Sequence, residues 1–132
     1  VEGLCRTALE VGELEEARAR LIEGLVLARE LGAQLAIARQ LENAALLTHK
    51  AGQSYDAVVF YAAAGKIRQS IGSPAPLIDQ QVFDAFAAGA EAELTPIKMK
   101  EAQHHGRALS QDKLFDLAQS LRSVNHLIVD KP

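Results

Sequence analysis

The segment Gly52-Gln53-Ser54-Tyr55-Asp56-Ala57 decides the fold, because it repeats a pattern found forty positions earlier (52 − 12 = 40) as Gly12-Glu13-Leu14-Glu15-Glu16-Ala17. In each segment a glycine is expected to end one helix, and an alanine five residues later is expected to be buried in the next. This arrangement is typical of antiparallel helical repeats, in which each unit packs on its neighbours. Such repeats usually bind partners, so the sequence predicts an all-α interaction module.

Apolar spacings of three and four residues extend this pattern in both directions along the chain. They predict helices at about 1–11, 13–31, 34–50, 55–71, 77–93, 96–105 and 111–122. The predicted inward-facing stripes include Leu31, Ile71 and Val82. The predicted boundary residues are a C-cap at Gly32, N-caps at Ser54, Thr95 and Ser110, and glycine breaks at Gly52 and Gly106.

The clearest interruption of the helical pattern is Gly72-Ser73-Pro74-Ala75-Pro76. It divides one predicted domain into repeat helices at 1–72 and further helices at 73–122 that pack on them, followed by a tail at 123–132. The chain starts with Val1 rather than Met, which favours a fragment of a larger protein. Because a solenoid fragment lacks a neighbour, we expect an exposed apolar flank at Val1, Leu4 and Ala8.

Composition and charge exclude several function classes. The chain has 132 residues, a net charge of −3 and 5% aromatic residues, which gives no electrostatic footprint for nucleic acid. A lone cysteine, Cys5, fits a reducing cytoplasm. The sequence contains no long apolar run and no secretory signal, so we predict a cytoplasmic protein without a membrane span.

No residue pattern in the chain predicts catalysis, a metal site or a cofactor. His104 and His105 are adjacent on a predicted helix and point about 100° apart, so they are poorly placed to bind one metal ion even with Glu101 nearby. Cys5 has no recognisable base beside it and is interpreted as a packing residue. Glu13, Glu15 and Glu16 are interpreted as a solvated first helical turn, where the helix dipole favours carboxylates.

Two polar sets remain as candidates for binding. Lys98, Lys100 and Arg107 form a modest basic patch, too small for useful nucleic-acid affinity. Arg39, Asn43 and Lys50 lie on the helix that lines the inner groove of tetratricopeptide folds, and they are the predicted binding-groove residues. Tyr55 is a further candidate for this groove, whereas Phe60 and Tyr61 are predicted core residues. A plain solvated face is the competing interpretation for each polar residue.

The run Gly52, Ala57, Tyr61, Ala64, Arg68 and Ile71-Gly72-Ser73-Pro74, followed by Gly106-Arg107-Ala108-Leu109-Ser110, resembles a known region. It is similar to the tetratricopeptide-like C-terminal region of bacterial signal-transduction ATPases and LuxR-type multidomain transcription regulators. In that family a repeat pair ends in an Arg-x-x-Ile-Gly-x-Pro turn, and a Gly-Arg-Ala-Leu-Ser link precedes the last helix. The resemblance implies a tetratricopeptide-like α-α superhelix of antiparallel helix pairs at the end of a transcription-regulation or signal-transduction protein.

Two function hypotheses follow from the pattern and the resemblance. The first is a non-enzymatic protein–protein interaction and regulatory module, which docks a protein partner or the adjacent ATPase domain of the same chain. The second is a domain that senses a small-molecule effector in its concave groove. Neither hypothesis involves direct nucleic-acid contact by this fragment, and a homodimer stays open as a further partner.

Overall fold

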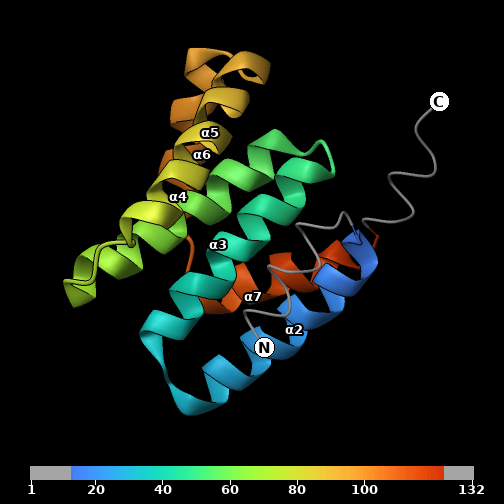
Figure 1. Cartoon of the computed structure of the whole chain (residues 1–132), viewed down its shortest axis with the longest axis vertical. Helices are drawn as coiled ribbons and strands as arrows, with labels where there is room; N and C mark the ends of the chain where they lie inside the picture. Colours follow the sequence, from blue (N-terminus) through green and yellow to red (C-terminus); the bar gives the residue numbers. More distant parts are fainter. Residues whose placement is uncertain (1–12, 124–132) are drawn as a thin grey trace.

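The computed structural model describes residues 13–123, and every element in that range is helical. The elements are α2 (Leu14–Leu31), α3 (Gln34–Lys50), α4 (Ser54–Ile71), α5 (Leu77–Glu93), α6 (Pro96–Ala108), α7 (Gln111–Gln119) and the 3₁₀ turn η1 (Ser120–Ser123). An all-α fold is therefore confirmed for the described residues. Figure 1 shows α3 and α4 side by side at the centre, with α5 and α6 on one side and α2 and α7 on the other.

Left-handed glycines follow the helices α2, α3 and α4. Gly32, Gly52 and Gly72 have φ values of 63°, 80° and 65° and stand at intervals of twenty residues (52 − 32 and 72 − 52). Glycine adopts this conformation without the steric cost that a Cβ imposes. Each glycine follows a helix of 17 or 18 residues, so α2, α3 and α4 run back and forth beside one another.

The core is centred on α3, which is buried on both sides because α2 and α4 flank it. Ile37, Leu41 and Leu47 are at most 2% exposed, and small alanines between them allow close helix packing. The predicted two-sided packing of this helix is confirmed. Phe60 is also fully buried, as predicted.

The last helix returns to the first described one. On α7, Phe115 is buried beneath the Arg29 guanidinium of α2, which lies 4.8 Å from the ring centroid. Arg29 also pairs with Asp112 at 2.8 Å. These contacts hold α7 against α2 on the same side of the α3–α4 pair, as Figure 1 shows.

Several predicted helix faces are wrong. Leu31 is 71% exposed, Ile71 40% and Val82 43%, although the apolar spacing placed all three inward. Leu31 and Ile71 occupy the last turns of α2 and α4, beyond the reach of the neighbouring helix. On α5, Phe86 and Ala90 are buried as predicted, but Phe83 is buried in place of Val82, because its ring stacks on Tyr61 of α4.

Two boundary predictions are also wrong. Ser54 is the first residue of α4 rather than its N-cap, and its hydroxyl donates a hydrogen bond to Glu93 on α5. Gly106 does not break α6, which continues to Ala108. By contrast, Thr95 and Ser110 cap α6 and α7 as predicted, accepting hydrogen bonds from the backbone amides of Lys98 and Lys113. The predicted helix at 1–11, Cys5, Gly12, the flank at Val1, Leu4 and Ala8, and the tail from 124 lie outside the described residues.

Candidate functional site

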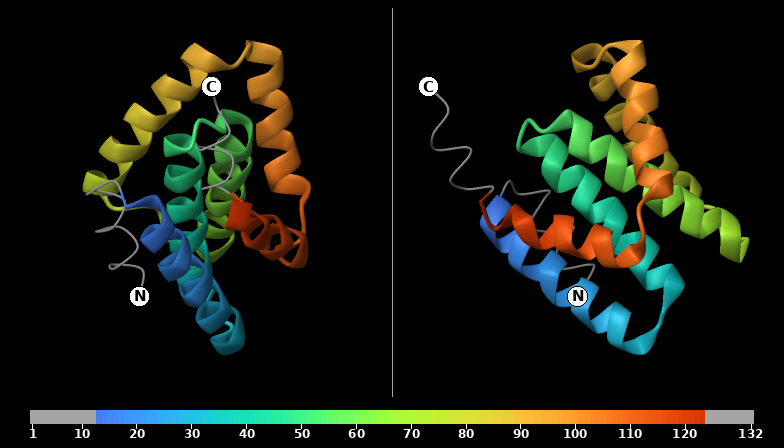
Figure 2. Two further views of the ribbon diagram at one scale, coloured as in Figure 1. Left: turned by 90° about the vertical axis from the view of Figure 1, so that its right-hand side faces the viewer. Right: turned by 180° about the vertical axis from the view of Figure 1, so that it is seen from behind.

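A concavity of the described chain lies over α4, between α5 and α6. These two helices diverge from the turn that joins them, as Figure 2 shows. The concavity has a volume of about 950 Å³. We call it the α4 groove, and define it by the side chains that line it on three helices. They are Val58, Tyr61, Ala62, Gly65, Arg68 and Gln69 on α4, Gln80, Phe86, Ala87 and Glu91 on α5, and Met99, Lys100, Gln103, His104 and Arg107 on α6. Glu42 of α3 and the turn at residues 72–75 complete the lining.

A buried ion pair lies beneath one end of the groove. Arg68 Nε and Nη2 donate to the two carboxylate oxygens of Glu42 at 2.6 and 3.0 Å, with the side chains 7% and 3% exposed. Arg68 Nη1 also donates to the backbone oxygen of Ser73 at 3.1 Å. Bidentate pairing of this kind fixes orientation as well as charge. Arg68 therefore anchors the turn at residues 72–75, which borders this end of the groove.

Aromatic rings hold α5 in place beside the floor. Tyr61 stacks on Phe83 at 5.0 Å between ring centroids and meets Phe86 edge-on at 5.5 Å. Phe86 in turn contacts the His49 ring of α3 at 5.1 Å. Burial raises the pKa of the Tyr61 hydroxyl, and the nearby Glu42 carboxylate raises that pKa further. The phenol thus stays neutral at ordinary pH and contributes a largely apolar surface to the groove.

The α6 wall is held against α4 by a close backbone approach. A Cβ built on Gly106 would overlap the Val59 carbonyl oxygen and come within 3.1 Å of Ala62 Cβ. Glycine at this position is what allows α6 to lie so near α4. The Lys66 ammonium of α4 also donates to the Arg107 carbonyl oxygen at 2.8 Å. These contacts fix the position of the α6 wall and bring a further positive charge beside it.

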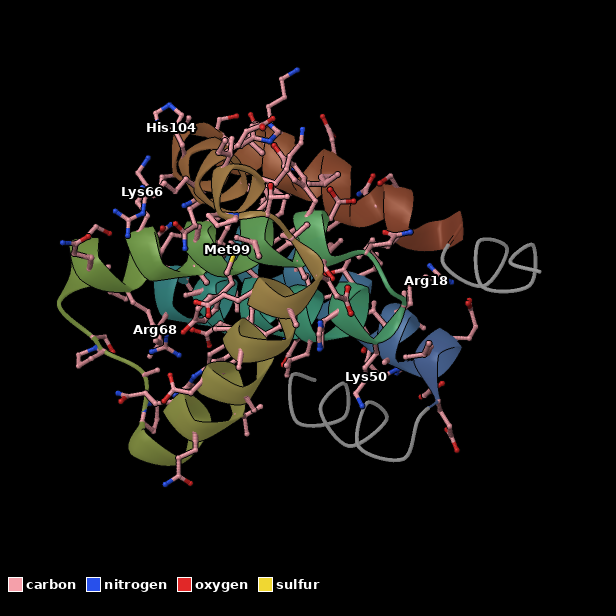
Figure 3. All side chains as sticks on the ribbon, turned by 90° about the horizontal axis from the view of Figure 1, so that it is seen from above. Arg18, Lys50, Lys66, Arg68, Met99 and His104 are labelled. Atoms are coloured by element: carbon pink, nitrogen blue, oxygen red, sulfur yellow. The ribbon has the colours of Figure 1, made fainter. Side chains whose placement is uncertain are left out.

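The two walls differ in charge. Lys100, His104 and Arg107 occupy the α6 wall, and His104 lies on the same side as Lys66 in Figure 3. Among residues 13–123, neither Lys100 nor Arg107 forms an ion pair. On the α5 side the lining charge is Glu91. The groove therefore presents an apolar floor, a cationic wall and a weakly anionic wall to a ligand.

The predicted binding residues lie elsewhere. Arg39 and Lys50 are exposed, whereas Asn43 is 1% exposed and its amide donates to Gln40 Oε1 at 3.4 Å. None of the three lines the α4 groove. Figure 3 places Lys50 and Arg68 at opposite ends of the α3–α4 pair. That Arg39, Asn43 and Lys50 take part in binding stays a prediction.

The other candidates are distributed over several surfaces. Tyr55 does not line the groove, and its hydroxyl donates to Glu101 on α6 at 3.4 Å. Of the basic patch predicted at 98–107, Lys100 and Arg107 line the groove, but Lys98 pairs with Glu101 at 3.4 Å on the outer face. In the part of the chain that the structure describes, no three metal-binding side chains come together.

Sequence reasoning missed the floor of the groove. Val58, Ala62 and Gly65 share one face of α4 at intervals of four and three residues, but a stripe of small residues looks the same whether a helix covers it or not. The available signal was Gly65 itself, since an exposed mid-helix glycine weakens a helix unless its small size is useful. Met99 and Gln103 continue the same surface on α6.

Comparison of the chain with protein-family models, with curated proteins and with solved structures finds no match. Within residues 13–123, none of the helices combines the length and apolar composition that a membrane crossing requires.

Proposed function

We propose that this chain is a protein-interaction module that binds a segment of a partner protein in the α4 groove. The observation that carries the proposal is the groove itself: about 950 Å³ of concave surface with an apolar floor and one cationic wall. Uncovered apolar surface of this kind usually marks a binding site. The groove offers apolar, amide and cationic contacts to a ligand. Its histidine, His104, forms no hydrogen bond among the described residues to a hydroxyl or carboxylate that could make it a general base.

The wider setting of the module is also a proposal. The left-handed glycines that follow α2, α3 and α4 support a tetratricopeptide-like α-α superhelix. The sequence Gly-Arg-Ala-Leu-Ser at 106–110, which spans the end of α6 and the cap of α7, supports the resemblance to LuxR-type regulators and signalling ATPases. On that basis the partner is a cytoplasmic protein or the adjacent ATPase domain of the same regulator. The module itself is non-enzymatic and makes no direct nucleic-acid contact.

A groove-filling variant tests this function. Gly65 lies on the groove floor, and a Cβ added there meets nothing within 4 Å, so a side chain can leave the backbone without a clash and we expect Gly65→Trp to fill the groove. Ala88→Trp adds the same bulk to an exposed position of α5 that does not line the groove. In affinity capture from a lysate of the source organism, we expect a partner that wild type and Ala88→Trp retain and Gly65→Trp loses. Retention by all three baits would contradict the proposal.

A second candidate function is small-molecule sensing. The groove volume lies near the upper end of the range of about 300–1,000 Å³ typical of ligand pockets, and the buried Arg68–Glu42 pair beneath it offers polar anchoring. A thermal-shift screen separates the two functions, because a ligand that binds only the native state raises the melting temperature. A metabolite that stabilises wild type but not Gly65→Trp would favour the sensor.

A further inference from the structure

We propose that the occupant of the α4 groove is an amphipathic helix with its apolar stripe on α4 and acidic residues facing α6. This inference rests on the proposed function and names the chemistry of the partner segment. Three observations carry it: the shape of the walls, the state of their backbone groups, and the charge on α6.

The walls of the groove are themselves helical faces. Residues Ala62, Gly65 and Gln69 repeat at intervals of three and four along α4, and Lys100, His104 and Arg107 repeat at intervals of four and three along α6. Such rows form ridges and furrows into which the side chains of another helix pack. Ala62 and Gly65 carry at most a methyl group, so the backbone of a bound helix can approach α4 closely.

The volume fits about two turns of such a helix. A helix about 10 Å across, with a rise of 1.5 Å per residue, occupies roughly 120 Å³ per residue. The groove volume of about 950 Å³ therefore corresponds to about eight residues of inserted helix.

The backbone of the occupant decides between a helix and an extended strand. The backbone amides and carbonyls of α4, α5 and α6 are already paired within their own helices, so the walls have no free sheet edge for a strand to join. An extended segment would lose hydration of its peptide groups over the apolar floor without recovering those hydrogen bonds. A helix satisfies its own backbone and presents only side chains to the groove.

Charge sets the orientation of the helix about its axis. The α6 wall carries Lys100 and Arg107, which form no ion pair among residues 13–123, and Lys66 lies beside them. The facing helix α5 has no Lys or Arg anywhere from Leu77 to Glu93. Because the chain as a whole has a net charge of −3, this cationic wall is a local feature. Acidic residues on one flank of the occupant therefore face α6.

The test is a selection from a displayed library of random peptides of about 16 residues, long enough for roughly four helical turns. The wild-type chain is the bait. We expect enriched peptides with apolar residues at spacings of three and four and with Asp or Glu along one flank. Synthetic versions should gain helical circular dichroism on binding, and their amide chemical-shift changes should map to α4, α5 and α6.

Matched charge variants sharpen the test. Lys100→Glu/Arg107→Glu reverses the α6 wall, and we expect it to weaken binding of the selected peptides by about tenfold or more. Lys98→Glu/Lys113→Glu makes the same change in net charge at exposed positions outside the groove and should bind as wild type does.

Each other outcome overturns a defined part of the inference. In one outcome, Gly65→Trp abolishes binding of the selected peptides, but those peptides bind in an extended conformation or carry no acidic flank. That result overturns the inference of an acidic helix and leaves the proposed function standing. Peptides that bind Gly65→Trp as well as wild type, or a library that yields no binder, overturn both. Equal loss of binding in the two charge variants overturns the orientation toward α6.

Discussion

The Arg68–Glu42 ion pair places two charges where water hardly reaches, at 7% and 3% exposed. Removing one partner leaves the other charge buried and uncompensated. We therefore expect Glu42→Gln to lower the free energy of unfolding by about 3–5 kcal/mol in urea titrations. The double variant Glu42→Leu/Arg68→Met should recover most of that loss, because it buries no charge.

An exposed pair provides the control for this prediction. Arg20 and Glu23 pair at 3.0 Å on the surface of α2, with the glutamate 51% exposed. Glu23→Gln should change stability by less than about 1 kcal/mol. A loss as small for Glu42→Gln would mean that water screens the Arg68 pair, contrary to its burial.

Tyrosinate absorbance reports on two groups alone, because the chain contains no tryptophan and Tyr55 and Tyr61 are its only phenols. Burial raises the pKa of both, and Glu42 adds to the effect at Tyr61 while Glu101 adds to it at Tyr55. We expect tyrosinate absorbance in the folded chain to appear above about pH 10, and at about pH 10 in urea.

The same shift makes stability depend on alkaline pH. A phenol whose folded pKa exceeds its unfolded pKa contributes stability below the unfolded value, and loses it as pH rises through the folded value. Tyr61→Phe should therefore lessen the fall in unfolding free energy above about pH 10. An identical alkaline fall in wild type and Tyr61→Phe would show that Tyr61 titrates freely in the folded chain.

At the scale of the elements, two helical glycines have opposite roles. Gly106 of α6 lies against the Val59 carbonyl oxygen, whereas a Cβ on Gly65 of α4 meets nothing within 4 Å. Gly106→Ala should lower the unfolding free energy by about 1–2 kcal/mol, since overpacking outweighs the gain in helix propensity. Gly65→Ala should raise it by up to about 1 kcal/mol. Equal stabilisation by both alanines would mean that α6 does not approach α4 so closely.

The glycines and caps of the chain show which helix ends a sequence can predict. Gly32 and Gly52 end helices as expected, and the caps at Thr95 and Ser110 form as expected, because these signals act between residues close in the chain. Gly106 looked like one more helix end. Its role instead depends on α4, about fifty residues away, which no local pattern reveals.

Of the residues that line the candidate site, the sequence predicted only the basic ones as a group. Lys100 and Arg107 stand out in the sequence as part of a basic patch, and both line the groove. Its floor could not be foreseen, because whether α5 covers the α4 stripe depends on which face of α5 turns inward. An alanine-rich helix such as α5 has a weak apolar asymmetry, so Val82 and Phe83 compete for the inward position, and the aromatic stack with Tyr61 selects Phe83.

At the scale of the whole molecule, burial is uneven between the two sides of the groove. Helix α3 is buried along most of its length, whereas α5 is attached through one face that includes Phe83, Phe86 and Ala90. Segments with few buried contacts open below the free energy of global unfolding. We therefore expect amide hydrogen exchange to be faster throughout α5 than in α3.

Phe83→Ala tests whether α5 opens as a separate unit. The substitution removes the ring stacked on Tyr61, and truncating a buried phenylalanine costs about 3–5 kcal/mol. If α5 opens alone, its amides should lose nearly all protection while those of α3 keep most of theirs. Equal loss in both helices would mean one cooperative unit and a rigid groove. Separate opening would mean that the α5 wall moves, so a helix filling the α4 groove should restore the protection of α5 by packing against Phe86 and Ala87.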